Sequence, residues 1–412
     1  MYLLKKDVVF RNLFINALLV ILSYGAASLT ALASNAIFQP IKVMFLFYSF
    51  FQIKKIFFLN NITKKVYVFG FLILVTVFFS VDPITSFKKF STMVFPLIYI
   101  SASINYLLNR YSIVTILCEL TSIFRLIYVL PIISFIIFGG DLSLQSIYGD
   151  TIGAFVSNHY GWSSYVFIIS HIFLIKNNYS KLISFWSLFL IIAFILLIVS
   201  GSRSSLLSLF LSLSIWLWFS KINILSKVLL VSLSASFIFV VLNSGSSDNF
   251  RQQKTSSQLE FYNNTNNTNY KNNSASLSDT RKSARDIGVI TFLENPILIV
   301  TGLGFLKFND GIGKYFPIIS KDYYRSGIHN SYLELFFGCG IFVFLYFLWH
   351  FTIRPLFIYI KYFKTNLLLY VGVVLIIPFF ESNITGGQFL FYPWFILIFL
   401  LLNFSENRKF KK

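Results

Sequence analysis

Charged residues are scarce in this chain of 412 residues: only 12% are Asp, Glu, Lys or Arg, whereas 56% are hydrophobic. A soluble globular protein of this size needs more charge on its surface, so the composition excludes that class. Cysteine is scarce as well. Cys118 and Cys339 both lie in apolar segments, and no Cys/His cluster has the spacing of a metal site, so we infer neither a disulfide framework nor a bound metal.

Apolar runs long enough to cross a bilayer, each of roughly 20 residues, recur about twelve times. They lie at approximately 12–33, 35–53, 66–81, 90–108, 112–138, 163–176, 182–200, 203–220, 228–243, 329–350, 366–381 and 389–403. The sequence therefore predicts an all-α polytopic membrane protein. The weakest run is 112–138, because Glu119 and Arg125 interrupt it, and an interfacial helix followed by a span is an alternative there.

The distribution of basic residues predicts how these spans are oriented. The net charge of +19 would suggest nucleic acid as the partner of a soluble chain. Here the Lys and Arg residues lie mostly in short loops between apolar runs, so membrane topology is the better explanation. With the N-terminus inside, nineteen of them fall on the cytoplasmic side, and only Lys88, Lys89 and Arg203 fall in short outer loops. We expect both termini in the cytoplasm and no nucleic-acid partner.

Three regions follow from this topology: spans one to nine in 1–243, a large outer loop in 244–328, and the last three spans with a cytoplasmic tail in 329–412. The loop begins with an Asn/Ser/Thr-rich tract, 244–278, which has too few aliphatic residues to bury a core and is expected to be flexible. Order is expected to resume in 279–328.

The later part of this loop carries helix and turn signals. Residues 281–294 predict an amphipathic helix that ends at Asn295-Pro296. The apolar stretch 297–306 contains Gly302 and Gly304, which imply a tight turn. We expect this part of the loop to lie on the outer membrane surface over a cavity.

Three arginines are candidates for binding an anion. Arg203 lies in a short Gly/Ser-rich break between two apolar runs, where a hairpin does not require arginine; the alternative is a side chain that reaches lipid headgroups. Arg281 and Arg285 lie one helical turn apart and share a face, which could equally be a solvated basic face. The planar guanidinium group suits phosphate because it donates two parallel charge-assisted hydrogen bonds.

His329 is the candidate proton acceptor. It precedes a long apolar run on the outer side, and an imidazole with a pKa near 6.5 can take a proton from a sugar hydroxyl at neutral pH. A helix-capping or interfacial histidine is the alternative. His159, in the smaller outer loop 139–162, is a weaker candidate, whereas His171 falls inside a span and His350 at a cytoplasmic end.

The order of these motifs resembles that of the bacterial O-antigen ligase/polymerase superfamily, which includes the WaaL ligases and the Wzy polymerases. The matching elements are Gly201-Ser202-Arg203, the arginine-led helix ending in Glu294-Asn295-Pro296, Gly302-x-Gly304, and His329 to Glu334 followed by Gly338 and Gly340. Arg281 matches the family arginine by its spacing. The aromatic residue usually found four positions later is replaced by Arg285, so both arginines are retained as candidates.

The resemblance implies a metal-independent glycosyltransferase of the GT-C type, without a cofactor, at the periplasmic face of the bacterial inner membrane. Its donor would be a glycan on undecaprenyl diphosphate. Arg203 and Arg281, with Arg285, would bind the diphosphate, and His329 would be the general base; His159, Asn330, Tyr332 and Glu334 would contact substrate. The resemblance also admits a chain-length regulator as a protein partner.

Two acceptors are compatible with this chemistry. A polymerase uses the sugar of another lipid-linked repeat unit, and a ligase uses the lipid A–core. The long Asn/Ser tract and the Phe-rich sequence favour the polymerase. A polysaccharide flippase or transporter is the alternative from another class, but the sequence shows no correspondence between its two halves, which many transporters have.

Overall fold

The computed structural model describes residues 7–13, 61–80, 82–138, 152–181, 184–199, 203–219, 288–305, 331–362 and 397–403, together with a few isolated positions. Within these ranges the chain forms helices and no strand, as the sequence predicts for an α-helical membrane protein. The predicted spans at 12–33, 35–53, 228–243 and 366–381 and the Asn/Ser-rich tract lie entirely or almost entirely outside the described residues.

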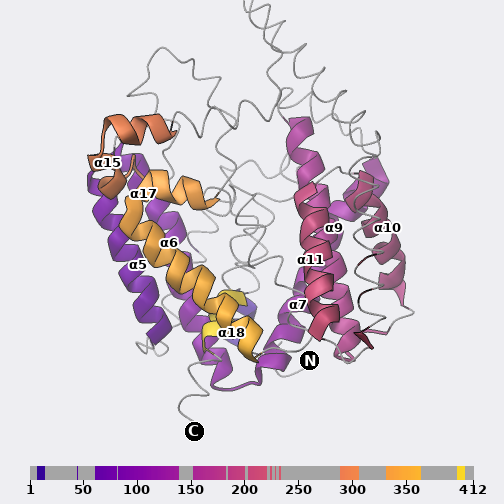
Figure 1. Cartoon of the computed structure of the whole chain (residues 1–412). Helices are drawn as coiled ribbons and strands as arrows, with labels where there is room; N and C mark the ends of the chain where they lie inside the picture. Colours follow the sequence, from indigo (N-terminus) through magenta and orange to yellow (C-terminus); the bar gives the residue numbers. More distant parts are fainter. Residues whose placement is uncertain are drawn as a thin grey trace, which may run out of the picture.

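Most of the helices run up and down along one common direction (Figure 1). Their bounds are α5 Asn61–Phe78, α6 Pro83–Leu108, α7 Ile113–Phe138, α9 Ile152–Lys176, α10 Phe185–Val199, α11 Arg203–Phe219, α15 Ile297–Thr301, α17 Ser331–Phe347, a π-helix at Leu348–Ile353, and α18 Arg354–Tyr362. We call the end at which α15 lies the upper end and the end at which α18 finishes the lower end (Figure 1).

α7 confirms the predicted run 112–138 and rules out its alternative, an interfacial helix followed by a span, whereas α9 corrects a predicted loop. α7 is one continuous helix, because Glu119 and Arg125, which are 2% and 7% exposed, are buried within the protein and do not interrupt it. α9 begins at Ile152, so residues 152–162, predicted as part of a loop, are helical and His159 lies on a helix. The polar residues around His159 lower the local hydropathy, but they do not prevent helical backbone geometry.

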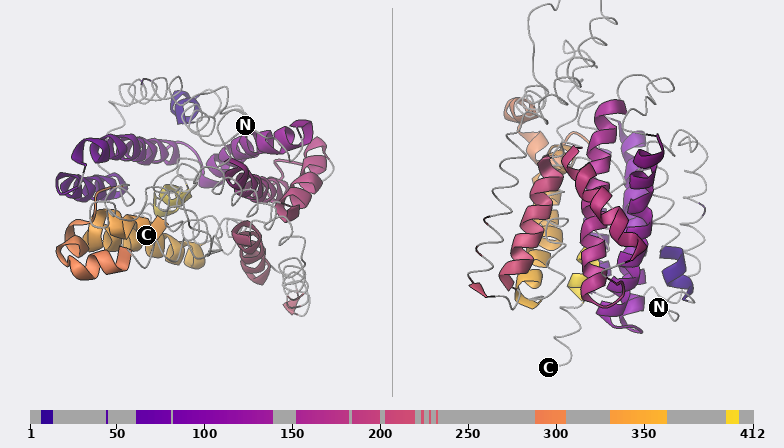
Figure 2. Two further views of the ribbon diagram at one scale, coloured as in Figure 1. Left: turned by 90° about the horizontal axis from the view of Figure 1, so that it is seen from above. Right: turned by 90° about the vertical axis from the view of Figure 1, so that its right-hand side faces the viewer.

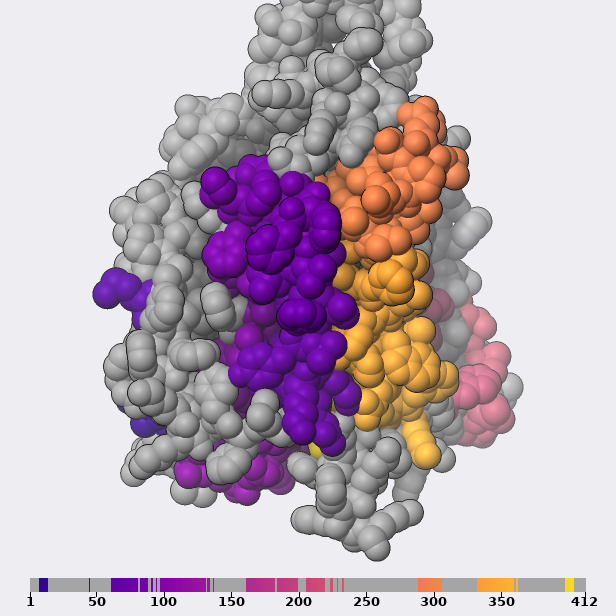
Figure 3. Space-filling model, turned by 90° about the vertical axis from the view of Figure 1, so that its left-hand side faces the viewer, coloured from indigo at the N-terminus to yellow at the C-terminus, as the bar shows by residue number. Residues whose placement is uncertain are grey.

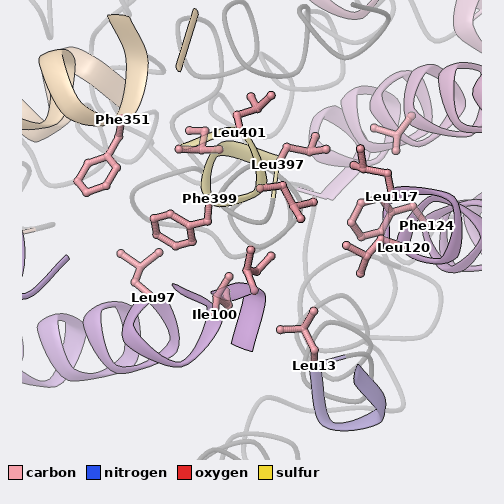
Figure 4. Close-up of a cluster of buried hydrophobic side chains, with 14 of the residues drawn as sticks. Leu13, Leu97, Ile100, Leu117, Leu120, Phe124, Phe351, Leu397, Phe399 and Leu401 are labelled. Carbon is pink, nitrogen blue, oxygen red and sulfur yellow. The ribbon is translucent and has the colours of Figure 1, made fainter. Parts of the chain in front are cut away.

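The helices form two groups. α5, α6, α15, α17 and α18 lie on one side, and α7, α9, α10 and α11 on the other (Figures 1 and 2). A short helix at residues 397–403 lies between them, and its leucines and Phe399 meet buried residues of α6, α7 and the π-helix (Figure 4). The ring of Phe399 is 6.1 Å from that of Phe351, measured between centroids. The described part of the last predicted span, 389–403, therefore joins the two groups.

Three described helical segments are long and apolar enough to cross a membrane: Asn61–Phe78, Ile113–Leu130 and Tyr332–Ile358. Large apolar side chains such as Phe71, Leu188 and Ile191 are exposed on the helix surfaces. In water this exposure would be unfavourable, whereas a bilayer accommodates it. Figure 3 shows that α5, α6 and the α17–α18 segment form one continuous face, with residues 288–305 seated above it.

Candidate active site

The beginning of α17 folds back on the rest of its own helical segment. At Gly340 the backbone leaves helical geometry, with φ 76° and ψ 179°. The Tyr332 hydroxyl then donates a hydrogen bond to Thr352 Oγ1 at 3.3 Å. In a straight helix these residues would be about 30 Å apart along the axis. The predicted straight span 329–350 is therefore broken, because glycine permits a backbone conformation that hydropathy does not reveal.

The turn that follows α15 packs against α17 at the break at Gly340. The backbone N–H of Leu303 donates to the carbonyl of Phe337 at 2.8 Å, and that of Gly304 donates to the carbonyl of Gly338 at 2.9 Å. A break within a helix leaves the carbonyls before it without their regular donors, and these two bonds supply replacements. The turn predicted from Gly302 and Gly304 is confirmed, with φ values of 71° and 116°.

Glycine is required on both sides of this junction. A Cβ atom on Gly302 would overlap the Gly338 carbonyl, and one on Gly340 would overlap the Val300 carbonyl. Both obstacles are backbone atoms, which cannot rotate away as a side chain can. We call the contact between residues 300–304 and 337–340 the glycine junction. It fixes the segment 297–305 against the first half of α17.

The turn between α5 and α6 supports the glycine junction from below. Ser80 Oγ lies 2.6 Å from Ser86 Oγ, and both residues are buried. A Cβ on Gly304 would overlap the Ser80 hydroxyl, so the turn after α15 contacts this serine pair directly. The Asp82 carboxylate caps α6 by accepting from the Thr85 N–H at 3.1 Å. This cap holds Ser86 in place one turn into α6.

Aromatic packing attaches the preceding helix as well. Residues 288–294 are helical, and Phe292, which is 4% exposed, lies 5.4 Å from Phe336 and 5.0 Å from Phe337 between ring centroids. The end of this helix at Asn295-Pro296 is confirmed. The helix at residues 288–294 and the first half of α17 therefore form one packed unit at the upper end.

The structure places some of the predicted site residues and not others. Arg203 is the first residue of α11, at the upper end of the second helix group. His159 lies in the first part of α9. Four predicted residues lie outside the described ranges: Arg281, Arg285, His329 and Asn330. His329 precedes Ser331, where α17 begins, by two positions.

Two candidate site residues of the 329–334 motif, Tyr332 and Glu334, lie in the described part of the chain. Tyr332 is 9% exposed, and its ring packs against Phe347 at 6.2 Å in addition to its bond with Thr352. This contact holds the fold-back of α17. Glu334 lies in the first turn of α17, where the positive end of the helix dipole favours a carboxylate. Substrate contact by either residue stays a prediction.

Ser80 and Ser86 are positioning residues that the sequence-based reasoning missed. Ser80 lies at the end of an apolar run and Ser86 in the first turn of the next helix, and a hydroxyl in either place gives no signal of a distant contact. Asp82-Pro83 predicts a helix start, because Asp is a preferred N-cap residue and Pro suits the first helical position. That signal predicts where α6 begins but not what its first turn supports.

The described helices and their exposed apolar surfaces define an α-helical membrane protein with a broken helix and a docked loop at one end. Residues 188–348 match the family model described as O-antigen ligase. This region contains α11, the helices at 288–294 and 297–301, and α17, and the match supports the resemblance of these motifs to the O-antigen ligase/polymerase superfamily. Members of this family are glycosyltransferase-like enzymes. No curated protein and no solved structure shows a significant match to the chain.

Proposed function

We propose that this protein is a surface-polysaccharide polymerase that transfers an undecaprenyl-diphosphate-linked glycan to a sugar hydroxyl of another lipid-linked repeat unit. The observation that supports it is the glycine junction together with the Phe292 packing. They bring two motif segments, 288–304 and 331–340, into one unit although some 25 residues of loop separate them. A catalytic centre assembled from separate segments needs such a fixed contact.

The proposed reaction needs a proton acceptor, a diphosphate-binding site and stabilisation of the leaving group's negative charge, which residues of the motif segments and α11 supply. His329 accepts the proton of the acceptor hydroxyl, which then attacks the anomeric carbon with inversion. Arg203 and Arg281, with Arg285, bind the diphosphate and stabilise the negative charge that develops as it leaves. Because a lipid diphosphate is already a good leaving group, the reaction needs no metal ion. Among the described residues no group of three or more His, Cys, Asp and Glu side chains could hold one; the metal-free mechanism stays a prediction.

The directions of the described helices support a periplasmic site. Basic residues gather where helices begin or end at the lower end: Lys64, Lys65, Arg110, Lys176, Lys181, Arg354 and Lys361. The positive-inside rule then assigns the lower end to the cytoplasm. α15 and the start of α11 lie at the opposite end (Figure 1). The motif segments would therefore face the periplasm of an inner-membrane protein.

Changing Arg203 to Lys is expected to lower polymer synthesis about 10-fold or more without lowering the amount of protein in the membrane. Lysine keeps the charge but cannot form the two parallel bonds, and one lost charge-assisted bond is worth about 1.5–3 kcal/mol. The measurement is polymer length and amount per unit of membrane protein. Arg110→Lys is the matched control, because Arg110 lies at the lower end over the Tyr106 ring at 4.1 Å. Wild-type synthesis by the Arg203 variant would exclude bidentate binding.

Gel electrophoresis of lipopolysaccharide from a deletion strain tests the choice of acceptor. Loss of a polymerase is expected to leave core carrying a single repeat unit. Loss of a ligase, the function for which the family is described, would leave bare core with polymer still on the lipid carrier. Accumulation of repeat units in the inner leaflet would indicate a flippase and overturn the enzymatic proposal.

A further inference from the structure

A second polar cluster lies in the other helix group, around the buried Arg125 of α7. Its guanidinium Nη1 donates to Ser180 Oγ at 3.0 Å and lies 3.3 Å from His171 Nδ1. The guanidinium carbon lies 4.3 Å from the centre of the Trp186 ring. Arg125 is 7% exposed and His171 is fully buried. The cluster joins α7, α9, the α9–α10 turn and α10, and it has no part in the proposed reaction.

The positive charge of Arg125 has no carboxylate partner among the described residues. Arginine has only donors, so His171 Nδ1 accepts and the imidazole carries its proton on Nε2 as a neutral ring. Neither Arg125 Nε nor His171 Nε2 has a hydrogen-bond partner within the described part of the chain. Glu119 lies six residues earlier on α7, which places it about 120° around the helix axis. A buried guanidinium whose charge is not neutralised is costly, so an anion nearby would be stabilised.

A cavity opens beside this cluster at the lower end. Its volume is about 610 Å³, and the described residues that line it are Ile175, Asn178, Tyr179, Ser180 and Lys181. None of them is acidic. Ser180 belongs to both the cavity and the Arg125 cluster. Because its oxygen accepts from Arg125, its own proton is available to a group in the cavity.

The turn that forms this cavity has a fixed backbone. Asn178 adopts a left-handed conformation with φ 60°, which asparagine tolerates better than most residues. The Tyr179 N–H donates to the Leu174 carbonyl at 2.9 Å, and the Asn177 N–H to the Phe173 carbonyl at 3.1 Å. Ser180 and Lys181 therefore follow a defined helix end. Burial, with the nearby Cys118 and Glu119, raises the pKa of Tyr179, which keeps its hydroxyl neutral.

We propose that this cavity binds a phosphate group, with the Ser180 hydroxyl and the Lys181 ammonium as direct ligands and Arg125 as the positioning charge behind Ser180. A lysine and a serine whose hydroxyl is polarised by arginine match the oxygens of a phosphate monoester or diester. The phosphate would belong either to an anionic lipid headgroup, since the cavity lies at the end of apolar helices, or to inorganic phosphate.

The test measures binding to the full-length protein purified in detergent. One arm records the melting temperature with and without inorganic phosphate, and the other records retention of phosphatidylglycerol against phosphatidylcholine by native mass spectrometry. Ser180→Ala and Lys181→Gln are each expected to weaken binding about 10-fold. Lys64→Gln is the matched control: it removes the same charge from an exposed lysine of α5, in the other helix group.

The two arms separate the sources of the phosphate. Stabilisation by inorganic phosphate that both variants lose would assign the site to free phosphate. Preferential retention of phosphatidylglycerol, lost in both variants and kept in Lys64→Gln, would assign it to a lipid headgroup. Equal behaviour of wild type and both cavity variants in the two arms would overturn the proposal. Polymer synthesis does not enter either readout, so failure here leaves the proposed function untouched.

Discussion

Substitution of His329 by Ala is expected to abolish long-chain polysaccharide while leaving the protein in the membrane at its normal level. Removing a general base typically costs a factor of about 10² to 10⁴ in rate. A polymerase slowed by that factor would leave mostly single repeat units on the core. The measurement is the lipopolysaccharide ladder together with an immunoblot of the membrane fraction. The fold-back of α17 is held by Tyr332, Thr352 and the glycine junction, none of which the substitution alters.

The matched control for this experiment is His350→Ala. His350 belongs to the same helical segment but lies on the π-helix below Gly340, with its ring tilted against that of Tyr346 at 4.5 Å between centroids. Its loss is expected to leave the ladder unchanged. A normal ladder from the His329 variant would rule out its role as the base. Equal loss from both variants would show that the defect comes from disturbed packing of the segment and not from lost proton transfer.

The fold class could be predicted because it depends on composition and hydropathy, which are properties of short stretches. Runs of about 20 apolar residues indicated helices, and α10 and α11 begin and end within about three residues of the predicted runs. A predicted helix boundary was wrong where a polar stretch of sequence nevertheless forms regular helix. The polar residues before Trp162 suggested a loop, yet α9 continues through them to Ile152. For the run 112–138 the prediction was right, because Glu119 and Arg125, which suggested a break as the alternative, are buried inside a continuous helix.

The candidate site could be predicted only as separate segments. The glycines at 302, 304 and 340 signalled unusual backbone, but nothing in the sequence says that the first two meet the third. The contact depends on backbone N–H and carbonyl groups, which every residue has, so no side-chain pattern records it. The same holds for Ser80, whose partner Gly304 lies more than 200 positions away. A contact between backbone groups that are far apart in the sequence can therefore be found only from the structure.

Replacing Gly340 with alanine is expected to remove polymer synthesis as completely as loss of His329, although Gly340 touches no substrate. The backbone at φ 76° and ψ 179° belongs to a region that is essentially restricted to glycine, and another residue there costs about 1–3 kcal/mol. The added methyl would also overlap the Val300 carbonyl, with the Ile299 carbonyl close behind at 2.9 Å. Both atoms belong to the backbone of α15, so relief requires moving the whole outer-loop segment away from α17.

Gly70→Ala supplies a matched control for that substitution. Gly70 lies in the middle of α5, and a Cβ there would meet only the Cγ1 methyl of Val94, at 2.7 Å. A valine methyl can shift by rotation of one side chain, so a modest loss of stability and nearly normal synthesis are expected. The two variants add the same atom group to glycines of the same helix group. They differ in whether the obstacle is a rotatable side chain or fixed backbone.

Two measurements on the purified variants separate positioning from folding. The Gly340 variant is expected to keep its helical content by circular dichroism, because the helices of both groups do not depend on the junction. Proteolysis should then cut the 288–305 segment faster than in the wild type, because the bonds of Leu303 and Gly304 to α17 are lost. A variant with normal polymer and unchanged proteolysis would show that the junction tolerates a side chain. Such a result would remove the structural support for a site assembled from the two motif segments, while the match of residues 188–348 to the O-antigen ligase family model would be unaffected.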